Sequence, residues 1–78
     1  MDIDIAFKAE LAELKNDIID NPECGEDLGE QAFGVFRLWM RMAGYLADDE
    51  NDTIAAMREY ACGVSRFGSA MYEKACGQ

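Results

Sequence analysis

The sequence predicts an all-α fold, a small three-helix bundle with short acidic connecting turns. Apolar residues recur at steps of three and four in three separate segments, and none of these segments shows the strict alternation of a strand. The chain has 78 residues, 50% of them hydrophobic, which suffices for one small core. We therefore expect a single helical domain, residues 1–78, with helices over about residues 4–20, 27–47 and 52–75.

The first predicted helix, residues 4–20, has one apolar face. Asp2 or Asp4 can cap its first turn with a carboxylate oxygen. Asn21 precedes Pro22, and a residue before proline is pushed out of the α region, so we expect the helix to end there. The large apolar side chains follow steps of four, three and four: Phe7, Leu11, Leu14 and Ile18.

The second predicted helix, residues 27–47, is the most apolar part of the chain. Asp27 and Glu30 have the spacing of a capping box, which predicts the helix start. Gly29, Gly34 and Gly44 each cost about 0.8–1 kcal/mol relative to Ala inside a helix, so we expect close helix approach there, or a kink near Gly34 or Gly44. The apolar positions cover more than half of the circumference: Leu28, Ala32, Val35, Phe36, Leu38, Trp39, Met40, Met42, Ala43 and Leu46.

The third predicted helix starts after an acidic turn, and Asn51 or Asp52 can cap it. Tyr60 and Phe67 widen its apolar seam on one side, and Gly77 lies where a helix C-terminus favours glycine. The seam keeps steps of three and four up to residue 75: Ile54, Met57, Ala61, Val64, Gly68, Met71 and Ala75.

The charge excludes several classes of function. A net charge of -9 repels phosphate, so we expect no direct binding of nucleic acid. The chain has no His, which removes the commonest general base and the commonest catalytic zinc ligands. Glu23 and Glu26 could act as acid and base, but nothing supplies an apolar pocket that would separate their pKa values. We therefore expect no enzyme and no cofactor.

The same composition bears on metals, disulfides and location. Three Cys without a C-x-x-C spacing support neither a disulfide framework nor a zinc site, so we expect reduced thiols. Residues 48–59 match an EF-hand loop at positions 1, 3, 5 and 12, but Thr53 stands where the loop needs Gly, so we expect a turn and a capped helix and no metal. The acidic start and the arginines within residues 32–47 argue against a signal or membrane segment and favour a cytoplasmic protein.

The acidic residues are concentrated on one surface. Residues 1–31 carry a net charge of -8 and residues 48–53 a net charge of -4, whereas the apolar segment 32–47 is net +2. On the first helix Glu10, Glu13, Asp17 and Asp20 fall within about 80° of one another beside the apolar face. The loop acids Glu23, Glu26 and Asp27 can extend this stripe, and the second turn adds further candidate partner-binding residues: Asp48, Asp49 and Glu50.

A second candidate surface is apolar. Met and aromatic side chains are favoured where a surface must adapt to a partner, although the same residues are also the usual contents of a core. The second helix has more apolar circumference than two neighbouring helices can cover, and burial in a homodimer would cover the excess. The candidate residues are Phe33, Phe36, Trp39, Met40 and Met42.

These features support two hypotheses of function. In the first, the protein is a small acidic inhibitor of the anti-CRISPR or anti-restriction type, from a phage or other mobile element, which mimics nucleic acid and occludes a basic surface of a host protein. In the second it is a helical adaptor, secretion chaperone or assembly factor that binds through the apolar second helix. A solvated helix face that keeps the protein soluble would explain the same charges. The two functions differ in how the affinity for the partner depends on salt concentration.

Overall fold

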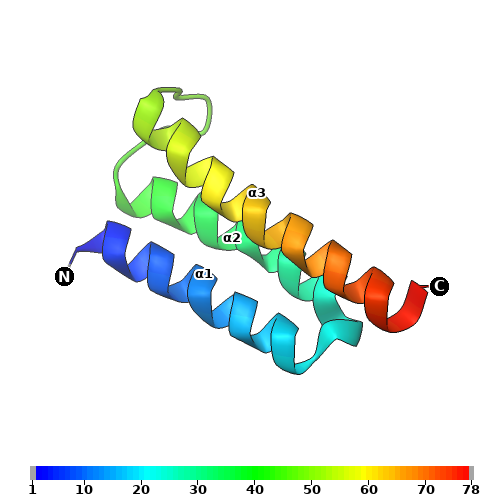
Figure 1. The fold of residues 1–78 in the computed structure, drawn as a ribbon. Coiled ribbons are helices and arrows are strands. Elements are labelled where there is room, and N and C mark those ends of the chain that lie inside the picture. The colour runs from blue at the N-terminus through cyan, green and yellow to red at the C-terminus, as the bar shows by residue number, and fades with distance from the viewer. Residues whose placement is uncertain (1, 78) are drawn as a thin grey trace.

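Three antiparallel helices form the protein, as the computed structural model of residues 2–77 shows (Figure 1). They are α1 (Ile3–Asp20), α2 (Gly25–Met42) and α3 (Asp52–Tyr72). A short 3-10 turn, Pro22–Cys24, joins α1 to α2, and a π-helical turn, Glu73–Gly77, continues α3. The predicted all-α three-helix bundle is confirmed, and residues 2–77 include no strand.

Local signals set both ends of α1, as predicted. The Asp2 side chain caps the helix by accepting a hydrogen bond from the backbone N–H of Asp4 at 2.9 Å. At the other end, the N–H of Asn21 still bonds to the carbonyl oxygen of Asp17 at 2.9 Å, and Pro22 then ends the helix. The four apolar residues predicted for its inner face are all buried.

The start of α2 differs from the prediction. The helix begins at Gly25, two residues before Asp27, and its N-cap residue Cys24 makes no side-chain cap bond. The capping box predicted from Asp27 and Glu30 is therefore wrong. The physical reason is tertiary, because Gly25 is buried against α3, where an added Cβ would lie 2.2 Å from the carbonyl oxygen of Gly68. The 3-10 turn leads the chain directly into this contact.

The end of α2 differs more. The helix ends at Met42, five residues before the predicted residue 47. Gly44 has a φ of 87°, and its N–H bonds to the carbonyl oxygen of Arg41 at 3.1 Å, while the N–H of Tyr45 bonds to that of Met40 at 2.9 Å. This pair of bonds is a Schellman motif, so Gly44 ends the helix and marks neither a close approach nor a kink inside it.

The third helix begins where the sequence predicts. Asn51 caps it by accepting a hydrogen bond from the N–H of Ile54 at 2.8 Å. Regular α-helix ends at Tyr72, three residues before the predicted residue 75, because the last residues form the π-helical turn. Met71 is half-buried and Ala75 exposed, so the buried part of the predicted seam runs from Ile54 to Gly68.

The core lies between the three helices, and α2 and α3 approach most closely. A Cβ added at Gly29 would lie 3.0 Å from the Cα of Ser65, and one added at Gly68 would lie 2.2 Å from the carbonyl oxygen of Gly25. A Cβ added at Gly34 would meet nothing within 4 Å. The bundle measures 42 × 25 × 15 Å, so its cross-section is flattened. Each helix contributes four buried apolar residues: Phe7, Leu11, Leu14 and Ile18; Ala32, Phe36, Trp39 and Met40; Ile54, Met57, Ala61 and Val64.

Candidate functional site

The first candidate surface is the acidic flank of α1, which we call the acidic stripe: Glu10, Glu13, Asp17 and Asp20. All four side chains are exposed. Glu23 in the 3-10 turn and Glu26 and Asp27 in the first turn of α2 are also exposed, and they follow Asp20 at the same end of the bundle. Seven of the ten acidic residues that we expected to bind a partner therefore lie on α1 or at the end of the bundle where α1 meets α2.

The other three predicted acidic residues lie in the connection between α2 and α3, at the opposite end of the bundle (Figure 1). The carboxylate of Asp49 is half-buried and accepts a hydrogen bond from the N–H of Leu46 at 2.7 Å. Glu50 pairs with Arg58 at 3.0 Å, and Asp48 is exposed. Two of these residues therefore have local contacts in the turn, and none of the three extends the acidic stripe.

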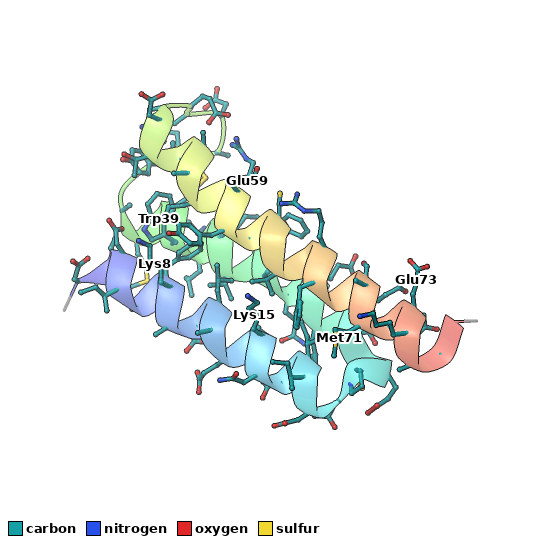
Figure 2. The ribbon with its side chains drawn as sticks, in the orientation of Figure 1. Lys8, Lys15, Trp39, Glu59, Met71 and Glu73 are labelled. Carbon is teal, nitrogen blue, oxygen red and sulfur yellow. The ribbon has the colours of Figure 1, made fainter. Side chains whose placement is uncertain are left out.

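The cations of the chain do not neutralise the acidic stripe. Among residues 2–77 there are two ion pairs, Arg58 with Glu50 and Arg66 with Glu59, and neither includes a carboxylate of the stripe. The two lysines of α1 point toward α3 instead (Figure 2). Lys8 lies over the ring of Tyr60, with Nζ 5.0 Å from the ring centroid, and Lys15 lies over Phe67 at 5.2 Å. The negative charge of the stripe is consequently left to solvent or to a partner.

Lys8 and Lys15 border a second surface, an open groove of about 950 Å³ between α1 and α3. Leu11 and Val64 contribute to its apolar lining, and Arg66 lies on its α3 side. Sequence analysis did not single out this groove. The sequence does contain a signal for it, because Lys8 and Lys15 on α1 are seven residues apart, as are Tyr60 and Phe67 on α3. Equal spacing lets each lysine lie over one ring.

The predicted apolar interface divides between core and surface. Phe36, Trp39 and Met40 are buried, and Trp39 is only 3% exposed. Its Nε1–H donates a hydrogen bond to the carboxylate of Asp4 at 2.7 Å. Phe33 and Met42 remain exposed. A Trp39→Ala substitution would therefore leave a cavity in the core, so a loss of binding in that variant would not identify an interface.

An apolar groove of about 250 Å³ lies between α1 and α2, and it was missed as a unit. Leu38 and Met42 are 56% and 62% exposed beside it. The acidic stripe borders it, because Glu10 is one of the lining residues. The other lining residues come from the N-terminal half of α1 and the C-terminal half of α2: Ile3, Ala6, Phe7, Val35, Leu38, Trp39 and Met42.

A spacing in the sequence accounts for this arrangement. On α1, one row of positions at steps of three and four begins apolar and continues acidic: Ile3, Ala6, Glu10, Glu13, Asp17 and Asp20. On α2, a second row with the same steps is mainly apolar: Leu28, Gln31, Val35, Leu38 and Met42. Because α1 and α2 are antiparallel, the apolar start of the first row lies beside the exposed apolar end of the second.

The remaining reactive groups suggest no other site. Within residues 2–77, no three Cys, Asp or Glu side chains lie together in a way that could hold a metal ion. All three cysteines are free, with Cys24 and Cys76 exposed and Cys62 half-buried. None of the helices described is long and apolar enough to cross a membrane.

No protein-family model, no curated protein and no solved structure matches this chain. The acidic stripe and the two grooves beside α1 are therefore interpreted from their chemistry.

Proposed function

We propose that the protein is a small acidic protein-binding module that occludes a basic, nucleic-acid-binding surface of another protein, in the manner of an anti-CRISPR or anti-restriction inhibitor. One observation carries the proposal, the row of four exposed carboxylates of the acidic stripe, none of which has an ion-pair partner within residues 2–77. The lysines of the same helix are engaged over aromatic rings on its other flank.

The spacing of the stripe suits a surface that binds phosphates. Successive carboxylates rise by about 4.5–6 Å along the helix axis, a scale similar to that of successive phosphates on a nucleic-acid strand. Lys and Arg side chains that donate hydrogen bonds to phosphate oxygens can donate them equally well to carboxylates. Long-range attraction between the stripe and a basic groove would also speed the encounter.

The fold itself gains little from these charges. Acidic residues at i, i+3 and i, i+4 repel one another by about 0.2–0.5 kcal/mol per pair. Asp17 and Asp20 also stand in the last turn of α1, where the helix dipole favours cations and the helix has no basic residue. A purely structural face would be expected to include lysines at some of these positions, so the pattern favours recognition of a basic partner.

The test begins with affinity capture from the native cytosol, followed by measurement of the captured target's affinity. We expect the dissociation constant to rise steeply between low and moderate ionic strength. Glu13→Lys combined with Asp17→Lys should weaken binding at least about tenfold. The matched control reverses two exposed acids outside the stripe, Glu30 and Glu73. Equal loss in both double variants would show that net charge alone acts, and would contradict a role for the stripe.

A second function is favoured by the exposed groove between α1 and α2. In this case the protein is a helical adaptor, secretion chaperone or assembly factor that binds its partner through the exposed apolar side chains of α2. Two copies that pair through the same side chains would form a homodimer. The supporting observation is the exposure of Leu38 and Met42. Binding that persists in high salt and in the Glu13→Lys, Asp17→Lys variant, but is lost in Leu38→Ser with Met42→Ser, would favour this function.

A further inference from the structure

The acidic stripe and the apolar groove belong to one face of the bundle. Glu10 lines the groove and is also the first carboxylate of the stripe. The row that holds both runs from Ile3 to Asp20, which is 18 residues, or about 26 Å along α1. A partner segment of that length lying along the row would meet an apolar floor first and carboxylates afterwards.

We propose that this face binds a basic amphipathic helix of the partner, an inference that rests on the proposed function and adds the chemistry of the recognised segment. Apolar side chains of that helix would pack in the groove against Ile3, Leu38 and Met42. Its Lys and Arg side chains would pair with Glu13, Asp17 and Asp20. Both hypotheses of function then describe parts of one interface.

The lining of the groove favours a helix as its occupant. An extended peptide would bring backbone N–H and C=O groups against the apolar side chains of Ile3, Ala6 and Val35, which offer them no hydrogen-bond partners. A helix satisfies its backbone internally and presents side chains at i, i+3, i+4 and i+7. About two helical turns span the row from Ile3 to its first carboxylate, Glu10.

Charge favours a different protein over a second copy of this one. Two copies each bring a net charge of -9. The only basic residues of α2 are Arg37 and Arg41, on either side of the exposed Leu38. If α2 of a second copy placed these arginines beside Glu10 and Glu13, its own N-terminal acids would extend along α1 to Asp17 and Asp20, or past the helix start to Asp2. Either direction sets acids against acids.

Three synthetic peptides of about 18 residues test the proposal. The first forms an amphipathic helix with leucines on one face and lysines on its flanks. The second keeps the lysines and replaces the leucines by alanines, and the third keeps the leucines and replaces the lysines by glutamates. Calorimetric titration into the full chain measures each affinity. The single tryptophan, Trp39, lines the groove, so its emission also reports on occupation.

We expect the leucine and lysine peptide to bind roughly tenfold or more tightly than either control peptide. Leu38→Ser with Met42→Ser should weaken it by roughly tenfold, and Glu13→Lys with Asp17→Lys by a similar factor. The matched control is Ile5→Ser with Ile19→Ser, which removes two exposed apolar residues of α1 outside the groove and should leave the affinity within about twofold.

Three results would overturn the proposal. In the first, the alanine and lysine peptide binds as tightly as the leucine and lysine peptide, and Leu38→Ser with Met42→Ser does not weaken binding of the latter. The stripe then acts alone, and the proposed function stands without the groove. In the second, neither lysine peptide binds, so this face does not bind a basic helix. The role of the stripe is then decided by the affinity of the captured target for the Glu13→Lys, Asp17→Lys variant. If light scattering shows a dimer of the protein that Leu38→Ser with Met42→Ser dissociates, a second copy occupies the groove.

Discussion

At the scale of single residues, two glycines permit the closest helix contact of the bundle. A Cβ on Gly25 would lie 2.2 Å from the carbonyl oxygen of Gly68, and a Cβ on Gly68 would lie 2.2 Å from that of Gly25. The obstacle in each case is backbone, which cannot rotate away as a flexible side chain can. A side chain at either position therefore requires α2 and α3 to separate.

We predict that Gly68→Ala lowers the free energy of unfolding by about 1–3 kcal/mol, because overpacking outweighs the gain in helix propensity. Urea denaturation followed by far-ultraviolet circular dichroism measures the change. Gly63→Ala is the matched control in the same helix, since nothing lies within 4 Å of its added Cβ. That variant should be stabilised by about 0.5–1 kcal/mol. Equal effects at both positions would contradict the close contact.

Trp39 shows what helical periodicity could not predict. Its place on an apolar helix suits either a core or an interface, and only the fold shows that Phe7, Phe36 and Tyr45 surround it, with ring centroids 5.6–6.0 Å away. The partner of its indole N–H is Asp4, 35 positions earlier in the chain. Asp4 was predicted as one of two candidates for the cap of α1, and Asp2 alone takes that role. Such a pairing depends on tertiary structure.

At the scale of helices, a boundary could be predicted when residues close to it in the sequence determine it. The end of α1 and the starts of α1 and α3 depend on a proline and on side-chain caps, all within four residues, and these boundaries were predicted. The start of α2 depends on a contact with α3, and its end on one glycine with positive φ. Glycine is compatible with a cap, a kink and a close contact, so its role at residues 25, 29 and 44 could not be decided from composition.

Gly34, inside α2, and Gly44, just beyond its end, test this account. Gly44→Ala should lower the free energy of unfolding by about 1 kcal/mol, because its φ of 87° strains a residue with a Cβ. Gly34→Ala should raise it by about 0.5–1 kcal/mol, because Gly34 is exposed within the helix and its Cβ would meet nothing within 4 Å. Denaturant titration of both variants measures the difference. Stabilisation by Gly44→Ala would contradict the Schellman end of the helix.

At the scale of the whole molecule, part of the candidate surface could be predicted and part could not. The acidic stripe needs only the 100° step of one helix, and its four residues are exposed as that step implies. The groove beside it needs the antiparallel placement of α1 and α2, which brings Ile3 near Met42. The second acidic turn was grouped with the stripe by charge alone, and the fold places it at the far end of the bundle.

Charge also sets a conflict between stability and binding in this molecule. With 16 acids against 7 bases, the charges of the chain repel one another in the folded state, and the ion pairs described within residues 2–77 include no carboxylate of the acidic stripe. We predict that the melting temperature rises by several degrees as sodium chloride is raised from about 20 mM to about 500 mM, because salt screens this repulsion. Thermal melts followed by circular dichroism measure the rise.

Charge reversal within the stripe should separate the two properties. Glu13→Lys with Asp17→Lys creates favourable pairs with Glu10 and Asp20 and places a cation in the last turn of α1. We expect about 1 kcal/mol of added stability, a melting temperature several degrees higher, and a smaller response to salt, in the same variant that should lose the basic partner. A reversal that lowers the melting temperature would mean that these carboxylates serve the fold, and the case for the stripe as a binding surface would then fail.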